Sequence, residues 1–200
     1  MPGQFFRRRA ADYITKQIRH TIPSNGDSRC SIIAHSFGTF IVASILRNHT
    51  DLKFRKIIFC GSVVQYKFPF EEYNHRFEGD LINEIGARDI WPVLAEVLTT
   101  GYGSAGTYGF RRPGVRDRWH NGTTHSAFLK RDFCLKYWVP YLGDGQIVED
   151  DEEVEPPPWW LGIVATLQPR YLIAVSAAVL IVWFLGHLVP ASWWPMHYLT

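Results

Sequence analysis

Short apolar runs rich in β-branched residues recur along the first 145 residues, with segments of helical periodicity between them. Three of these runs are typical of buried strands: Cys30–Ala34, Lys56–Cys60 and Leu81–Ile85. A weaker run, Val115–Trp119, predicts a fourth strand. Strands that alternate with helices along a chain form parallel sheets covered on both faces. The sequence therefore predicts an α/β domain built on a parallel sheet.

Helices are expected between these strands. An N-terminal helix is predicted from apolar residues that fall on one face at helical spacing: Phe6, Ala10, Tyr13, Ile14 and Ile18. Further helices are predicted at residues 38–49, 91–98 and 128–138, the last ending near Pro140. The interval 101–109 is a predicted glycine-rich loop.

A small polar pair, His35 and Ser36, follows the first predicted strand within the stretch AHSFGT. A nucleophilic serine must project from a tight strand-to-helix turn, and the residues two positions away must be small to avoid a collision across that turn. Ala34 and Gly38 meet this need. The stretch resembles the nucleophile elbow of α/β-hydrolases, the lipase and esterase superfamily, usually written G-x-S-x-G. An N-cap serine beside a structural glycine is the alternative interpretation.

The resemblance covers roughly residues 5–142 and only the later half of the usual hydrolase chain. It implies a three-layer α/β-hydrolase-like domain that lacks the N-terminal strands and the loop that normally supplies a second oxyanion donor. The first predicted strand then has an unpaired edge, which attracts other chains. We expect this edge to pair with a second copy or with a partner chain that completes the sheet, unless the helix around Phe6–Ile18 covers it.

In this superfamily an acidic residue and then a histidine follow the serine along the chain. The resemblance implies Asp89 as the acid, in preference to Glu84, which falls inside a strand, and to Asp117. It implies His125 as the base, because this residue lies in the loop directly before the last predicted helix. His120, at the end of the fourth strand, is the competing histidine.

The implied chemistry is acyl transfer without a metal or an organic cofactor. His125 takes the proton of Ser36, Asp89 orients the imidazole, and the Phe37 amide is one oxyanion donor. His35 is expected to be a packing residue. Arg88 either keeps Asp89 ionised or faces solvent.

A 19-residue run without Asp, Glu, Lys or Arg, Tyr171–Val189, predicts a transmembrane helix, since it nearly matches a hydrocarbon core of roughly 30 Å. A buried helix of a soluble protein is the alternative. Aromatic residues flank the run on both sides, as at two membrane interfaces: Trp159, Trp160 and Tyr171 before it, Trp193, Trp194 and Tyr198 after it. Arg170 is the only close basic neighbour, which favours a cytosolic domain and a single-pass membrane protein.

These features divide the chain into a hydrolase-like domain at 1–145, an acidic, proline-rich linker at 146–170, the transmembrane helix at 171–189 and a short tail at 190–200. Six of the 19 carboxylates fall within residues 149–155, so the linker is expected to be an extended tether. Three widely spaced cysteines and a polar, basic N-terminus favour a reducing compartment and no signal peptide.

Residues 1–148 carry 20 Lys and Arg against 13 Asp and Glu, but no nucleic-acid-binding motif is present. The arginine clusters at 7–9 and 111–118 are expected to be solvated, with contact to lipid head groups or nucleic acid as the alternative. Two functions follow from the sequence. One is a membrane-anchored serine hydrolase that cleaves carboxylic ester bonds in lipid-like substrates. The other is a catalytically inactive membrane adaptor with a degenerate hydrolase fold.

Overall fold

The structure, a computed structural model, describes residues 2–21, 29–149, 153–167 and 169–188. Several residues named above lie outside the described part of the chain: Asp150, Asp151, Glu152, Val189 and the tail 190–200 with Trp193, Trp194 and Tyr198.

Four parallel strands form one sheet in the order β1-β2-β3-β4, as predicted for the α/β class. They are β1 (Cys30–His35), β2 (Phe54–Cys60), β3 (Leu81–Gly86) and β4 (Val115–His120). Each strand follows its sequence neighbour in space. Because all three pairings are parallel, the four carboxyl ends lie at one edge of the sheet. Ligands of open parallel sheets bind at this edge.

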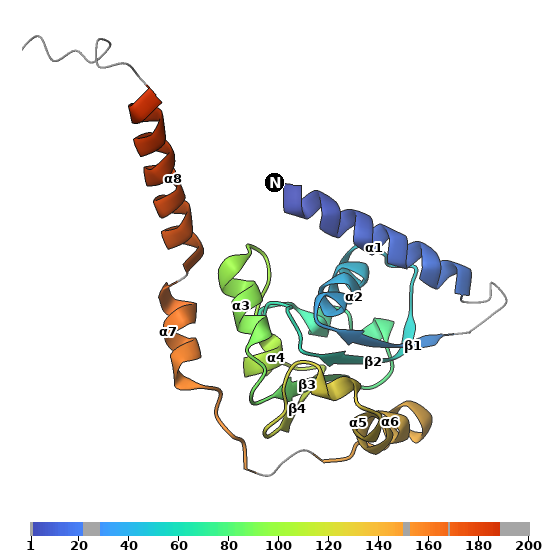
Figure 1. Ribbon diagram of the computed structural model, residues 1–200. Coiled ribbons are helices and arrows are strands. Elements are labelled where there is room, and N and C mark those ends of the chain that lie inside the picture. Colours follow the sequence, from blue (N-terminus) through green and yellow to red (C-terminus); the bar gives the residue numbers. More distant parts are fainter. Residues whose placement is uncertain (1, 22–28, 150–152, 168, 189–200) are drawn as a thin grey trace, which may run out of the picture.

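Helices cover both faces of the sheet and give three layers (Figure 1). One face carries α1 (Pro2–Thr21) and α2 (Phe37–Asn48). The other carries α5 (Arg131–Phe133), the π-helical turn η4 (Cys134–Trp138) and α6 (Val139–Asp144). The shorter elements are η1 (Phe70–Glu72), η2 (Asn74–Arg76), α3 (Trp91–Leu98), α4 (Ala105–Tyr108) and η3 (Ala127–Leu129).

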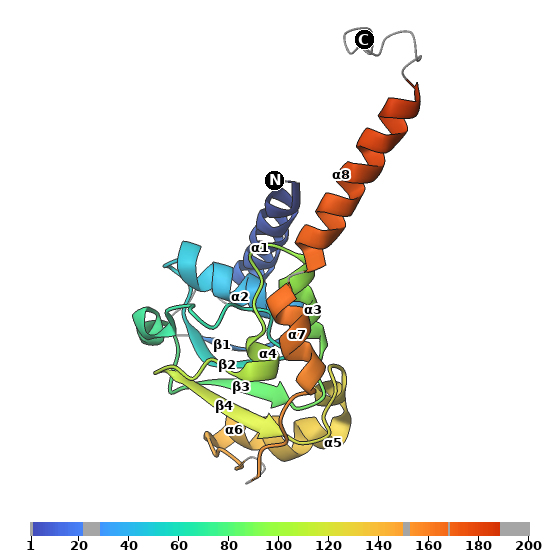
Figure 2. The same cartoon turned by 90° about the vertical axis from the view of Figure 1, so that its left-hand side faces the viewer.

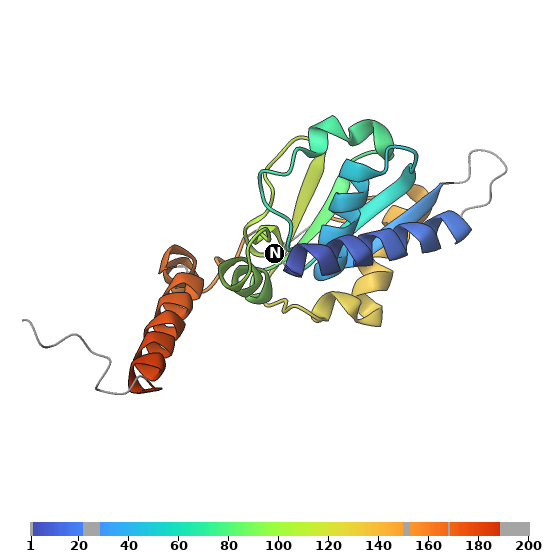
Figure 3. The same ribbon diagram turned by 90° about the horizontal axis from the view of Figure 1, so that it is seen from above.

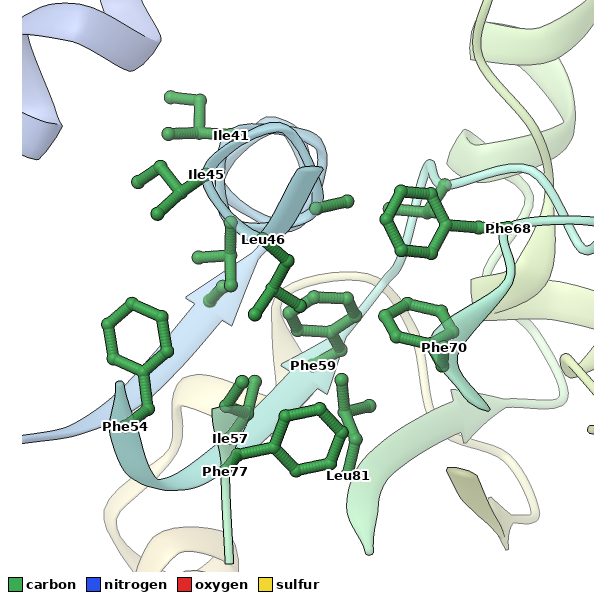
Figure 4. Packing of buried hydrophobic residues seen from close by; sticks show 14 of the residues in the cluster. Ile41, Ile45, Leu46, Phe54, Ile57, Phe59, Phe68, Phe70, Phe77 and Leu81 are labelled. Carbon is green, nitrogen blue, oxygen red and sulfur yellow. The ribbon is translucent and has the colours of Figure 1, made fainter. Parts of the chain in front are cut away.

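The main core lies between α2 and the sheet (Figure 4). Ile45 and Leu46 of α2 and Phe59 of β2 are completely buried there, and Phe70 packs on Phe59 with its ring centroid 6.0 Å away. A second cluster under η4 and α6 includes Trp138. Burial of this kind provides the main driving force for folding, and it fixes the strands whose ends carry the candidate site.

Only part of the predicted apolar face of the N-terminal helix is buried: Ala10, Ile14 and Ile18 pack against the core. Phe6 and Tyr13 are 67% and 62% exposed, whereas Ala11 and Thr15 are buried. The small Ala11 side chain suits the close packing of α1 on α2, which Figure 3 shows as two crossing helices. The Thr15 hydroxyl can be buried because it donates to the Ala11 carbonyl at 2.8 Å.

The described residues on both sides of positions 150–152 bind to the β4 side of the sheet, so this part of the chain is not the free, extended tether that its composition predicts. Arg118 donates to the Val148 carbonyl at 2.9 Å. Glu155 donates its backbone N–H to Asn121 at 2.7 Å and accepts the Gly122 N–H at 2.8 Å. These contacts bring the chain back along the domain.

The next element, α7 (Trp159–Leu167), packs against α3. Leu161 is fully buried there against Val93 and Val97. Part of the predicted linker is therefore a helix that belongs to the fold.

The last helix, α8 (Pro169–Leu188), projects away from the sheet (Figures 1 and 2). Its side chains from Tyr171 to Leu185 are all exposed. No single helix among the described residues is long and apolar enough to cross a membrane. The pair Trp159–Leu167 and Tyr171–His187, bent by 47°, meets the length and composition requirement together. The predicted single span is therefore not found among the described residues, and the bent pair meets the requirement by length and composition only.

Candidate active site

Ser36 stands at the junction of β1 and α2 with φ 52° and ψ −121°. A positive φ is uncommon for a residue with a side chain, and such strain persists only where the surroundings enforce it. Here the Ser36 N–H donates to the Cys60 carbonyl at 3.0 Å, and its own carbonyl accepts the Thr39 N–H at 3.0 Å and the Thr39 hydroxyl at 2.7 Å. The sharp turn at the serine is thus held from both sides.

The flanking residues are small, as the turn requires. A Cβ placed on Gly38 would lie 3.8 Å from the Cβ of Ala34, which is ordinary van der Waals contact. A larger side chain at either position would press on the other across the turn.

Asp89 and His125 form a hydrogen-bonded pair at the carboxyl edge of the sheet. His125 Nδ1 lies 2.8 Å from Asp89 Oδ2 and 3.0 Å from Oδ1. Because a carboxylate only accepts, Nδ1 carries the proton and Nε2 has the lone pair that a general base needs. The Asp89 side chain is fully buried, whereas that of His125 remains 19% exposed.

The backbone around Asp89 fixes the direction of its carboxylate. The Asp89 N–H donates to the Gly86 carbonyl at 3.0 Å, and Oδ1 accepts the Trp91 N–H at 3.1 Å. From α4, the Thr107 hydroxyl donates to the Asp89 carbonyl at 2.7 Å. These bonds limit the rotation of the carboxylate that orients His125.

Two residues close to the Ser36 turn, His35 and Gly61, approach His125. His35 Nε2 donates to the His125 carbonyl at 2.9 Å, and the two imidazole centroids are 4.4 Å apart. Gly61 follows Cys60, whose carbonyl accepts the Ser36 N–H. Gly61 has φ +56°, and a Cβ on it would lie 2.7 Å from the His125 ring. His35, expected to be a packing residue, therefore also holds the backbone of His125.

The competing residues Glu84 and His120 pair with each other. His120 Nε2 lies 2.7 Å from Glu84 Oε2, and Arg118 makes a bidentate contact to the same carboxylate with Nε 2.8 Å from Oε2. Trp138 Nε1 donates to Glu84 Oε1 at 2.9 Å. Burial raises the pKa of Glu84, but the hydrogen bonds and charges of Arg118 and His120 outweigh it and hold that pKa below its usual value.

The remaining charged candidates also have other partners. Asp117 accepts the Phe110 N–H at 3.1 Å and the Arg111 N–H at 2.7 Å, so it shapes the loop before β4. Arg88 forms an exposed ion pair with Glu155 at 3.1 Å. The three cysteines are unpaired, and burial raises the pKa of Cys60. The described residues include no cluster of three metal-ligating side chains.

The Phe37 N–H, the expected oxyanion donor, lies at the start of α2. Phe37 is the first residue of α2, so its N–H lacks an intrahelical acceptor and lies beside the serine. The interval 101–109 is not a loop throughout as predicted, because it contains α4. Its amides have other acceptors: Gly103 N–H donates to Val63 at 2.9 Å and Gly106 N–H to Ser62 at 2.8 Å. Its glycines allow the backbones to approach, because a Cβ on Gly106 would lie 2.2 Å from the Ser62 nitrogen.

Exposed aromatic side chains border the site. Trp91 is 58% exposed, and its ring centroid lies 6.4 Å from that of His125. Phe37, directly after the serine, is 36% exposed. An apolar part of a substrate would contact these rings first.

Comparison with protein-family models, curated proteins and solved structures gives no match for this chain. The fold defines the class plainly: a parallel four-stranded α/β protein with a helix-covered sheet and an apolar helix pair near its C-terminus. Membership of the α/β-hydrolase superfamily stays a prediction from the stretch AHSFGT and the residues that follow it.

Proposed function

We propose that this protein is a membrane-anchored serine hydrolase that cleaves carboxylic esters of lipid-like substrates. The observation that carries the proposal is the strained backbone of Ser36 beside an oriented, partly buried Asp89–His125 pair. A structural N-cap serine needs neither feature. Its side chain would also be expected to cap the helix, whereas Ser36 makes no side-chain capping bond to α2.

In this mechanism the Ser36 oxygen attacks the ester carbonyl and its proton passes to His125 Nε2. Asp89 holds the imidazole in the required tautomer and stabilises the imidazolium. The Phe37 N–H donates to the developing oxyanion, next to the positive end of the α2 dipole. His125 then protonates the leaving alcohol. A water molecule, deprotonated by the same histidine, releases the acid from the acyl-serine.

Support for a lipid-like substrate comes from the surroundings of the site. Phe37 and Trp91 offer apolar contacts, and the exposed apolar surface of α8 suits a bilayer. A helix that is apolar all round is either buried or in lipid. For the orientation we propose a cytosolic domain, because Arg170 is the only basic residue close to the apolar run.

A fluorophosphonate probe, which reacts with activated serines, tests the proposal. We expect the full chain to be labelled and Ser36→Ala to lose the label, while Ser126→Ala, which removes a hydroxyl next to His125, keeps it. Asp89→Asn should slow ester hydrolysis by about 10⁴-fold because the histidine adopts the wrong tautomer. Labelling that persists in folded Ser36→Ala would overturn the proposal.

A non-catalytic membrane adaptor is the second candidate, and one observation favours it. Within the described residues, the Gly103 and Gly106 amides already have acceptors, and loss of an oxyanion donor reduces turnover roughly 10²–10³-fold. An adaptor predicts a folded full chain that never reacts with the probe. The same labelling experiment therefore separates the two functions.

A further inference from the structure

A basic cavity of about 530 Å³ opens between the N-terminal half of α1, the α2 helix and the loops that follow β2 and α3. It is lined by Arg7, Arg8, Phe40, Ser44, Arg47, Asn48, Gln65, Thr100 and Gly101. Three of these residues are arginines and none is a carboxylate. Such a cavity attracts anions, and its volume lies within the range of small-molecule sites.

Two of the guanidinium groups are held in place by aromatic rings. The Arg7 guanidinium lies 4.2 Å from the Tyr102 ring centroid and 5.4 Å from that of Phe40. Its Nη1 donates to the Thr100 carbonyl at 2.9 Å. Arg47 lies 5.0 Å over the Phe68 ring. Rings that fix an arginine reduce the entropy lost on binding.

The loop after α3 is shaped to approach Arg7. Gly101 has φ +89°, a conformation that favours glycine, and a Cβ on it would lie 3.1 Å from Arg7 Nη1. A guanidinium has five N–H donors, and Thr100 accepts from Nη1. Further donors therefore remain for a ligand. Arginine in this setting prefers phosphate oxygens, and the Ser44 hydroxyl and the Asn48 and Gln65 amides supply neutral donors.

The position of the cavity indicates the source of the phosphate. The N-terminal end of α1 and the C-terminal end of α8 extend toward the same side of the molecule (Figures 1 and 2). Phe5 and Phe6, just before the arginines, are 58% and 67% exposed. Exposed aromatic and basic residues close to an apolar helix are typical of the headgroup level of a membrane.

We propose that this cavity binds the phosphate of an anionic phospholipid headgroup in the membrane that holds α8. The inference rests on the membrane attachment proposed above, but not on any chemistry at Ser36. Arg7 and Arg47 provide the fixed contacts. Arg8, exposed at the rim, adds charge and direct contact.

Isothermal titration of the full chain in neutral detergent with dihexanoyl phosphatidylglycerol tests this proposal, because the phosphate is the only charge of that lipid. We expect binding, and a loss of roughly fivefold in affinity for Arg8→Gln and for Arg47→Gln. Arg9→Gln is the matched control, since it removes the same charge one residue further along α1 from a side chain that does not line the cavity. It should bind like the unmodified chain.

Three results would overturn the proposal. An equal loss of lipid affinity in Arg9→Gln would mean that the basic helix α1 attracts the anionic lipid without a specific site. Equal binding of dihexanoyl phosphatidylcholine would remove the requirement for net negative charge. Inorganic phosphate that binds as tightly as the lipid would identify a soluble phosphate site instead. A parallel fluorophosphonate assay tests the hydrolase proposal independently of lipid binding. Arg8→Gln should lose affinity for the lipid but be labelled at Ser36 like the unmodified chain.

Discussion

Glu84 and Asp89 are both fully buried carboxylates bonded to a histidine, yet their surroundings give them different roles. Glu84 binds Arg118, Trp138 and His120, so its oxygens are occupied by donors from the core. Asp89 binds a histidine that reaches the surface. Strand geometry explains why Arg118 and His120 both reach Glu84. Residues two apart on a strand share a face, and in the β3–β4 register Glu84 is opposite Arg118, while His120 is opposite Gly86.

Replacement of Glu84 should therefore reduce stability, whereas replacement of Asp89 should reduce ester hydrolysis. Glu84→Gln leaves the Arg118 charge buried without its partner, and loss of one partner of a buried pair destabilises by about 3–5 kcal/mol. We expect a large drop in the urea midpoint for Glu84→Gln. Asp89→Asn should keep most of the stability and lose ester hydrolysis. A Glu84→Gln chain as stable as the unmodified one would contradict the buried network.

The pH dependence of stability follows from the same carboxylate. Its folded-state pKa lies below the usual value, so the unfolded chain binds the proton more readily. The contribution of Glu84 to stability is present above the ordinary glutamate pKa of about 4.3 and is lost as pH falls through the lower folded pKa. We expect unmodified protein to lose stability below about pH 4, and Glu84→Gln to show a shallower loss in urea titrations at each pH.

At the level of elements, short buried strands were predictable because each is a compact β-branched run. The helix α3 matches its prediction, Trp91–Leu98, since Pro92 fits the first turn. The helical segment predicted at 128–138 continues past Pro140, because this proline lies in the first turn of α6, where a proline fits. The face of α1 was predicted in part: Ala10, Ile14 and Ile18 pack against the core, whereas Phe6 and Tyr13 have the same helical spacing but are exposed.

The residues of the candidate site could be named from order along the chain, but their contacts could not. Sequence placed Asp89 and His125 after successive strands, whereas the pairing of His120 with Glu84 depends on register between β3 and β4. The bond from His35 to the His125 carbonyl depends on how two distant loops meet. The helix α7 was missed because the acidic, proline-rich residues before it favoured a tether.

The outer edge of β1 is apolar and lacks a neighbouring strand among the described residues. Among the described strands β1 pairs with β2 alone, and Ile33 is 44% exposed. A groove of about 390 Å³ runs beside it, bordered by Ile14 and Ile18 of α1. An apolar, unpaired strand edge promotes pairing between chains, and a lysine placed on it opposes that pairing.

We therefore expect the full chain in detergent to self-associate and Ile33→Lys to shift it toward a single-chain mass, measured by light scattering after size exclusion. Leu135→Lys, at a similarly exposed apolar residue on the opposite layer, is the matched control and should leave the mass unchanged. If the measured mass falls in both variants, or in neither, the proposed pairing through the β1 edge is wrong.

Across the whole molecule, the C-terminal region divides at the break between α7 and α8. Leu161 of α7 is completely buried against α3, whereas the apolar side chains of α8 face outward. The carboxylates just before α7 bind back to the domain, with Glu149 3.1 Å from Arg116 and Glu155 3.1 Å from Arg88. The α7 helix thus belongs to the folded domain by its contacts, and α8 is left to meet another environment.

Two truncations test this division. The full chain should stay with membranes at alkaline pH, while chains that end at Leu167 or at Asp150 should be released, because both lack α8. The Leu167 chain keeps Leu161 over Val93 and Val97, but the Asp150 chain exposes that surface. Full burial of a leucine contributes about 1.5–3 kcal/mol, so the Asp150 chain should unfold at a clearly lower urea concentration. Release of the full chain by carbonate would contradict membrane attachment through α8, and equal stability of the two truncated chains would contradict the docking of α7.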